Sequence, residues 1–291
     1  MQVVFHTGAH NTDGGRLLKC LLNNKEDFGR RNVAVPGPGK YRTLLKESFA
    51  ALDQAAPSED ARDVLVDAIL DEETTDRLVL TNEHFFGSAR FALGDGQLYP
   101  LAAVRMRQLD TLFDTDEIEL CMAVCNPATF LPNVLSRAAP EQQAQLLAAT
   151  PPQDLLWSEM FTRIRYALPD MPITVWCNED TPVIWPEVIR AVAGLEPGAK
   201  FNGGFDLLRE IMSREGMRRF RAYLRDHPDL NDAQKRRVMI AFLDKYALDE
   251  KLEEELDLPG WTSDLIEELT EIYDNDIQVL SEIPGLRLIA P

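Results

Sequence analysis

The sequence predicts an α/β fold in which helices flank a parallel β-sheet. Short apolar runs typical of buried strands alternate with helical patterns over the first two thirds of the chain, as they do in βαβ units. Beyond Gly203-Gly204 the pattern becomes almost entirely helical. No flexible linker separates the two parts. We therefore expect a single domain over residues 1–291, with an α/β core over 1–200 and a helical extension over 201–291 packed on it.

The first expected strand, Val3-Val4-Phe5, leads into a turn that is rich in glycine. Gly8 and the pair Gly14-Gly15 bracket this turn, and from Leu17 the apolar residues follow one face of a helix. A strand, a tight turn and a helix in this order direct free backbone N–H groups toward an anion. The turn contains no lysine, however, and Asp13 brings a negative charge to the point at which a phosphate would bind.

Further elements follow in order along the chain. Strands are expected over residues 78–80, 118–124 and 173–176, with short extended segments over 32–36 and 286–289. Helices are expected over residues 41–55, 58–71 and 101–113, after Asn126-Pro127, and from Thr181 to about Ala193. In the C-terminal part, Asn231 to Gln234 resembles a capping box, and the apolar stripe over 265–280 indicates a last long helix.

Polar residues gather where four of the expected strands end. These ends are His6 to Gly15, Asn82 to His84, Cys125-Asn126, and Asn178 to Asp180. In an open parallel sheet, ligands bind beyond the carboxyl ends of the strands, so we expect the four ends to form one crevice. A purely structural interpretation stays open for each end. Asn126 and Thr181 fit helix caps, and the histidines of the first turn could simply hydrogen-bond to its backbone.

Composition limits the classes of partner. The chain carries 30 basic and 48 acidic residues, a net charge of −18, which disfavours general binding to nucleic acid or to an anionic membrane. Many of the acids lie late, in Asp249-Glu250, Glu253-Glu254-Glu255 and Glu267-Glu268, and indicate a solvated helical face or a surface for a protein partner.

The sequence also predicts the cellular location of the protein and the state of its cysteines. No run approaches the ~20 apolar residues of a membrane helix, and the first strand starts at once, without space for a signal peptide. We therefore expect a cytoplasmic location. Four scattered cysteines fit neither a disulfide framework nor a metal site, and we expect buried free thiols.

Two stretches resemble the sulfotransferase family. The turn from His6 to Gly15 resembles the donor loop of bacterial members, which reads roughly HIGAHKTGTT. The stretch from Cys125 to Asn133 resembles the second donor motif, in which RxP is followed by a serine at the eighth position after the arginine. Glu83 is similar in place to an acidic residue that follows an early strand. The resemblance covers about residues 2–190. It implies a P-loop type of parallel sheet and the donor 3′-phosphoadenosine 5′-phosphosulfate.

The residues that bind the donor in this family are replaced in the chain. The loop lysine falls at Asn11, the first loop glycine at Asp13, the hydroxyl residues at Gly14 and Gly15, the arginine at Cys125 and the serine at Asn133. Sulfuryl transfer depends on charge stabilisation, and the loss of one such donor can cost on the order of 10²–10³ in rate.

Three functions stay open. The first is a sulfotransferase-like protein that lacks ordinary donor binding and is non-catalytic or altered in its ligand. The second is an active sulfotransferase that moves a sulfuryl group to a small hydroxyl or amine acceptor, with Arg16 supplying charge. In that case Glu83, His84 and His10 are the catalytic candidates. The third is a partner-binding role for the acidic region 249–282.

The residues expected to contact a small-molecule ligand in the crevice are Gly8, His10, Asn11, Thr12, Gly14, Gly15, Arg16, Asn126 and Asn133.

Overall fold

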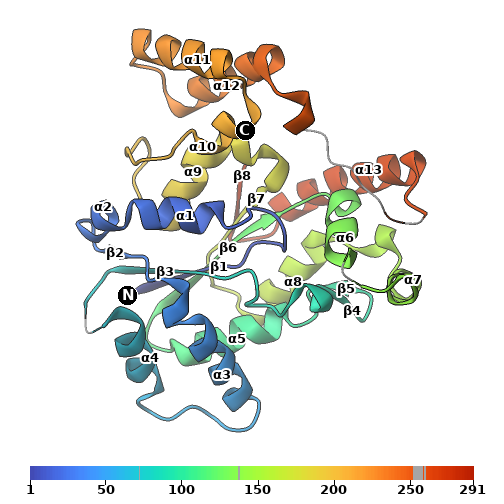
Figure 1. Ribbon diagram of the computed structural model, residues 1–291. Helices are drawn as coiled ribbons and strands as arrows, with labels where there is room; N and C mark the ends of the chain where they lie inside the picture. The colour runs from blue at the N-terminus through green and yellow to red at the C-terminus, as the bar shows by residue number, and fades with distance from the viewer. Residues whose placement is uncertain (72, 137, 252–257, 259) are drawn as a thin grey trace.

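Six parallel strands form the central sheet of the computed structural model, which describes residues 1–71, 73–136, 138–251, 258 and 260–291 (Figure 1). Their order is β2-β3-β1-β6-β7-β8. The strands are β1 (Gln2–His6), β2 (Val33–Ala34), β3 (Arg77–Thr81), β6 (Glu117–Val124), β7 (Ile173–Cys177) and β8 (Leu286–Ile289). The predicted fold class, a parallel sheet flanked by helices, is confirmed, and the Val3–Phe5 run lies in an inner strand.

Helices fill the connections between these strands. In the first two thirds of the chain they are α1 (Arg16–Asn23), α2 (Lys25–Gly29), α3 (Arg42–Leu52), α4 (Ala61–Leu70), α5 (Ala102–Leu112), α6 (Pro127–Leu135), α7 (Pro140–Ala149), α8 (Trp157–Ala167) and α9 (Thr181–Ala193). In the last third they are α10 (Asp206–Ile211), α11 (Arg214–Asp226), α12 (Asp232–Tyr246) and α13 (Ser263–Ser281). Within the described residues, no helix combines the length and the apolar character that crossing a membrane requires.

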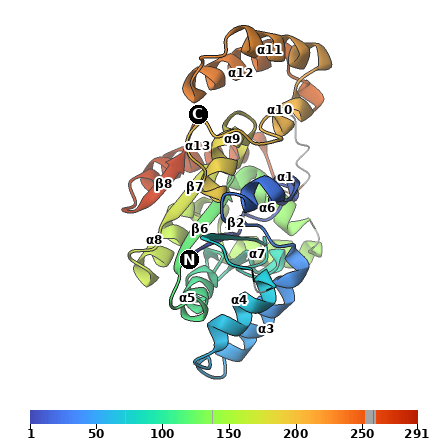
Figure 2. The same cartoon turned by 90° about the vertical axis from the view of Figure 1, so that its left-hand side faces the viewer.

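The sheet separates two apolar clusters, because successive side chains of a strand point to opposite faces. Val4 and Trp176 face α1 and α9, together with the buried residues of α10, α11 and α12. Val3, Phe5 and Leu80 face the other side, which α3, α4, α5 and α8 cover. Figures 1 and 2 show these two layers above and below the sheet.

The C-terminal third contributes to the sheet as well as covering it. α11 and α12 form a hairpin that lies beyond α9 and α10, farthest from the sheet in both views (Figures 1 and 2). The chain then returns through α13, which packs on α6 and α8, to β8, which pairs with β7. The division into a core over 1–200 and an extension over 201–291 stays a prediction. The predicted acidic run Glu253-Glu254-Glu255 lies outside the described residues.

Most local predictions hold, but α2, α7 and α8 were not predicted. Asn126 caps α6, since its Oδ1 accepts a hydrogen bond from the Ala128 N–H at 2.9 Å. Thr181, in contrast, is the first residue of α9, and its hydroxyl contacts the Cys177 carbonyl at 3.4 Å, so it is not a cap. A small antiparallel hairpin, β4 (Leu93–Gly94) with β5 (Gln97–Leu98), was not predicted. The four cysteines all lie within the described residues and form no disulfide; three are buried, as predicted, and Cys177 is half-buried.

Candidate functional site

The turn between β1 and α1 is held in a compact conformation by its own residues. Gly8, Gly14 and Gly15 have φ values of 60°, 55° and 77°, in the left-handed region that favours glycine. Asn11 is also left-handed, with φ 64°. The Thr12 hydroxyl donates to the Ala9 carbonyl at 2.7 Å. The glycines are therefore required by the path of the chain itself, independently of any ligand.

The side chain of Asp13 binds the N-terminus of α1. One carboxylate oxygen accepts from the Gly15 N–H and the other accepts from the Leu17 N–H, each at 2.9 Å. The Arg16 N–H donates to the Asp13 carbonyl at 3.0 Å. The amides at a helix N-terminus are the groups that would receive an external anion. In this protein the Asp13 carboxylate already accepts hydrogen bonds from two of these amides, those of Gly15 and Leu17.

The Arg16 side chain bridges the turn and α10. Its Nε lies 2.9 Å from Oε2 of Glu210, which is on α10, and its Nη1 donates to the Asp13 carbonyl at 3.0 Å. The guanidinium is about half exposed, so the pair is weak and can open. A role for Arg16 toward a ligand stays a prediction, and it would require release from Glu210.

A hydrogen-bonded chain runs from the core to the surface through His10. The buried His10 donates its backbone N–H to the Tyr99 hydroxyl at 2.9 Å, and its Nδ1 lies 2.7 Å from the same oxygen. Its Nε2 lies 3.1 Å from Nδ1 of His84, and Nε2 of His84 lies 3.8 Å from a carboxylate oxygen of Glu83. All three candidate catalytic residues thus lie next to one another.

The hydrogen-bond partners assign the protons in this chain. The Tyr99 oxygen accepts one backbone N–H, so its own proton goes to the strong acceptor Nδ1 of His10. His10 then carries its hydrogen on Nε2 and donates to His84 Nδ1, which leaves the His84 hydrogen on Nε2, facing Glu83. His84 therefore presents a donor at its outer nitrogen, and Glu83 is the acceptor of the group.

Tyr99 is held in a strained backbone conformation. Its φ is 45°, which is rare for a bulky side chain and costs on the order of 1–3 kcal/mol. The Tyr99 N–H donates to the Ala92 carbonyl at 2.8 Å, and Arg163 donates to the Leu98 carbonyl at 2.6 Å, so the loop is fixed on both sides. Burial holds the pKa of Tyr99 well above its usual value, so the hydroxyl keeps its proton. Strain of this kind is concentrated at functional sites.

Burial also sets the charge of His10. It lowers the pKa of His10 to about 4, although the nearby Glu83 acts in the opposite direction. The imidazole is therefore neutral near pH 7, in agreement with its role as donor and acceptor in the chain.

The depressed pKa of His10 predicts a loss of stability in acid. Between pH 6.5 and about 4 the unfolded chain binds a proton at this histidine that the folded protein excludes, so the free energy of unfolding falls as the pH falls. We expect His10 to account for about 2 kcal/mol of the loss between pH 7 and pH 4.5. Urea denaturation of the parent and of His10→Gln at both pH values measures it. The exposed His227, changed to Gln, is the control. Equal losses in the parent and in His10→Gln would contradict the assignment.

His10 and His84 line a cleft with a volume of about 1290 Å³. Its lining includes five of the predicted site residues, His10, Asn11, Glu83, His84 and Asn133. The opposite wall comes from the end of α6 and from α7. Five other turn residues predicted to contact a ligand are absent from the lining that the described residues give this cleft. They are Gly8, Thr12, Gly14, Gly15 and Arg16.

α13 covers the carboxyl ends of β6 and β7. The Asn126 N–H donates to Glu179 at 2.7 Å, and the Asn126 side chain donates to the Thr270 hydroxyl at 2.8 Å. The Tyr273 hydroxyl donates to the other oxygen of Glu179 at 3.1 Å. Asn126 thus joins two strand ends to α13, at a place separate from the cleft lining.

The position at which the family motif has an arginine is inside the core. The Cys125 side chain is only 5% exposed and belongs to the same apolar cluster as Phe130 and Trp157. The Trp157 indole N–H donates to the Cys125 carbonyl at 2.8 Å. A ligand phosphate would meet neither a cation nor an accessible side chain at this position.

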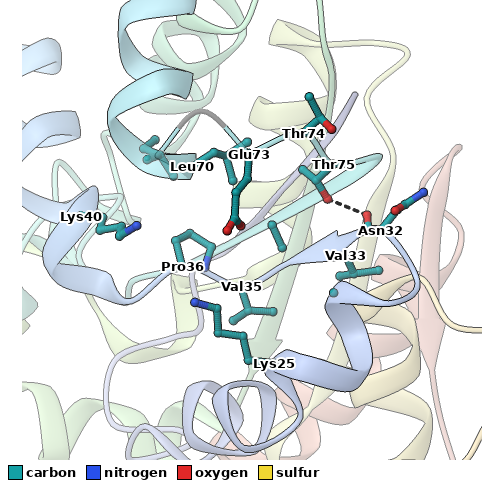
Figure 3. Close-up of a pocket in the computed structure, with 13 residues that line it drawn as sticks. Lys25, Asn32, Val33, Val35, Pro36, Lys40, Leu70, Glu73, Thr74 and Thr75 are labelled. Carbon is teal, nitrogen blue, oxygen red and sulfur yellow. Dashed lines mark hydrogen bonds between the residues drawn. The ribbon is translucent and has the colours of Figure 1, made fainter.

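A smaller hollow lies at the edge of the sheet beside β2, with a volume of about 100 Å³. Figure 3 shows Lys25 and Glu73 approaching it from opposite sides of Pro36. The nearby Lys40 is paired with Asp71. The volume suits a few water molecules, and none of the predicted site residues lines it.

Sequence reasoning did not identify Tyr99 or Glu210 as parts of the site. The Asp95-Gly96 pair is a turn signal that predicts the β4–β5 hairpin just before Tyr99. No local pattern pairs Tyr99 with His10, because the two residues are 89 positions apart.

Comparison with known proteins adds little to this geometry. No protein-family model and no curated protein sequence matches the chain. Among solved structures, a sulfotransferase from Alicyclobacillus acidocaldarius is similar at 15% sequence identity, with a TM-score of 0.43. The match covers 96% of this chain and 93% of that one. A likeness of this degree does not assign a ligand or a reaction, so the functional conclusion depends on the residues described above.

Proposed function

We propose that this chain is a sulfotransferase-like protein that does not bind the ordinary donor, 3′-phosphoadenosine 5′-phosphosulfate, at the turn after β1. It acts instead as a non-catalytic binding protein, or on an altered ligand, with the cleft beside His10 as its small-molecule site. The observation that carries the proposal is the Asp13 carboxylate, which accepts hydrogen bonds from the Gly15 and Leu17 amides.

The charges around the turn do not fit this donor. A phosphate 4 Å from Asp13 would be repelled by about 4 kcal/mol at an effective dielectric constant of ~20, before screening. Asn11 supplies no cation, and Arg16 is paired with Glu210. At the second motif, the buried Cys125 replaces an arginine. Both phosphate contacts of the family pattern are missing together.

A second candidate function, an active sulfotransferase, is favoured by one observation. Glu83, His84 and His10 line the cleft as a connected group. Such a group of a carboxylate and two imidazoles is suited to general acid–base catalysis. In this case Glu83 would take the proton from a small hydroxyl or amine, and Arg16 would have to leave Glu210 to supply charge. The acidic helical region as a partner surface and the cytoplasmic location stay predictions.

Calorimetry distinguishes these functions. Titration of 3′-phosphoadenosine 5′-phosphate into the unmodified protein is expected to give no saturable heat at ligand concentrations up to about 1 mM, the usual upper range of substrate constants. Near-ultraviolet circular dichroism of the same sample verifies that the protein is folded. A micromolar dissociation constant would contradict the proposal and favour the active transferase.

A further inference from the structure

Five arginines, four on the outer helical hairpin and one on α10, line one groove of a strongly acidic protein. The groove runs along α11 beside the end of α10 and has a volume of about 440 Å³. We call it the arginine groove, and its cationic lining consists of Arg209, Arg214, Arg218, Arg221 and Arg225. The methionines Met212 and Met217, both nearly buried, provide an apolar floor. Cationic walls over an apolar floor suit an amphipathic anion.

Four of these arginines form a row on α11. Residues 214, 218, 221 and 225 are separated by four, three and four positions, which places them on one face over about 16 Å of helix. Like charges at this spacing oppose helix formation. Within the described residues, Arg214, Arg218 and Arg221 have no ion pair, although the chain carries 48 acids. Arg219, outside the groove, is paired with Glu215 at 2.6 Å. Arg225 is paired with the adjacent Asp226 at 3.3 Å, and Arg209 with Asp206 at 3.5 Å. Three of the five groove arginines are thus left for a partner that supplies the opposite charge.

The hairpin that carries the row is tightly packed. A Cβ added to Gly216 of α11 would lie 2.4 Å from Cβ of Tyr246 on α12, so the two helices approach closely. Phe220 packs edge-on against Phe242, with ring centroids 5.6 Å apart. The hairpin lies farthest from the sheet (Figures 1 and 2), and the four arginines of the row are exposed. The arginine row is therefore a fixed and accessible array.

We propose that the arginine groove binds an acidic amphipathic helix of a protein partner. Carboxylates at helical spacing on that helix pair with the arginine row, because guanidinium groups bind carboxylates through two parallel hydrogen bonds. Apolar side chains between the carboxylates reach Met212 and Met217, since methionine adapts to the shape of its partner. The proposal is independent of the cleft and of the donor site.

A local segment fits the charge distribution better than an extended polyanion. The net charge of −18 repels a nucleic acid or an anionic membrane, whose charge extends beyond the hairpin. At physiological salt the screening length is about 8 Å, so a short helix lying in the groove interacts mainly with the arginines.

Fluorescence anisotropy on the full-length protein tests the proposal. The probe is a labelled, end-capped helical peptide of about 14 residues, with four glutamates spaced like the arginine row and leucines between them. We expect binding to the parent and a loss of about tenfold or more in the charge-reversal variant Arg218→Glu/Arg221→Glu. The matched control, Arg219→Glu/Arg237→Glu, makes the same change of charge at exposed residues outside the groove and is expected to retain the affinity.

Several results would overturn it. One is equal weakening in both double variants, because binding would then depend on total charge alone. Another is equal binding of an isomeric peptide whose glutamates do not share a face. Tighter binding of duplex DNA or of phosphatidylserine vesicles than of the peptide would assign the groove to another class of partner. Absence of peptide binding by the folded parent would also contradict the proposal.

Discussion

The double variant Asn11→Lys/Asp13→Gly is expected to bind 3′-phosphoadenosine 5′-phosphate at least about tenfold more tightly than the parent. Removal of the Asp13 carboxylate frees the Gly15 and Leu17 amides, and the lysine adds a cation beside them. The repulsion removed is about 4 kcal/mol before screening, and tenfold in affinity needs only about 1.4 kcal/mol. Calorimetry on the parent and the variant measures the difference.

The variant should remain folded at a moderate cost. Loss of the Asp13 side chain from the start of α1 costs about 1 kcal/mol, as for other helix caps. Lysine at the left-handed Asn11 costs about 1 kcal/mol more. The matched control is Asn32→Lys/Asp71→Gly, which makes the same changes of residue type at two left-handed positions outside the turn, the residue before β2 and the C-cap of α4. A folded Asn11→Lys/Asp13→Gly variant that binds no better than this control would mean that the turn has no access to a ligand.

A third change, Cys125→Arg, is expected to destabilise the fold and not to restore a phosphate contact. The family pattern has an arginine at this position, but here the side chain is buried among aromatic residues of the core. An unpaired guanidinium there would destabilise the fold by several kcal/mol, and its effect on affinity could not be separated from unfolding.

Asp276→Ala is expected to lower the free energy of unfolding by about 3 kcal/mol. Asp276 lies on α13 but binds the start of α8, where its carboxylate accepts from the Trp157 N–H at 2.6 Å and from the Ser158 N–H and hydroxyl. Removal of this acceptor leaves three buried donors without their partner, and the loss of a buried charged acceptor costs more than a surface cap. Urea denaturation measures the change as a lower midpoint.

The neighbouring Asp274 provides the control for this prediction. It is exposed on the same helix, so Asp274→Ala should change the free energy of unfolding by no more than about 0.5 kcal/mol. Similar midpoints for the two variants would show that the contact between α13 and α8 contributes little to stability.

The fold could be predicted because its signals are local. The Val3–Phe5 run, the Asn126 cap and the Asn231 capping box each lie within a few residues of the structure they specify, and each lies where the pattern places it. The β4–β5 hairpin also has a local signal, the Asp95-Gly96 pair, which is typical of a tight turn between two strands.

The candidate site could be predicted only in part, because its decisive contacts are not local. The position of Asp13 in the turn after the first strand predicted that its charge would repel a phosphate. That its carboxylate turns back onto the amides of α1 depends on the path of the whole turn. Tyr99 contacts His10 across 89 positions, and Asp276 caps α8 across 119. Contacts of this kind depend on how the helices pack, and no pattern within one segment of the sequence contains them.

Nuclear magnetic resonance of the backbone amides of Gly15 and Leu17 tests most directly whether Asp13 fills the anion site at the start of α1. In the unmodified protein, addition of 3′-phosphoadenosine 5′-phosphate should leave these two resonances unchanged, because both N–H groups already donate to Asp13. In Asn11→Lys/Asp13→Gly the corresponding resonances should shift with the ligand concentration. Saturable shifts of Gly15 and Leu17 in the unmodified protein would contradict the proposal that Asp13 excludes the donor.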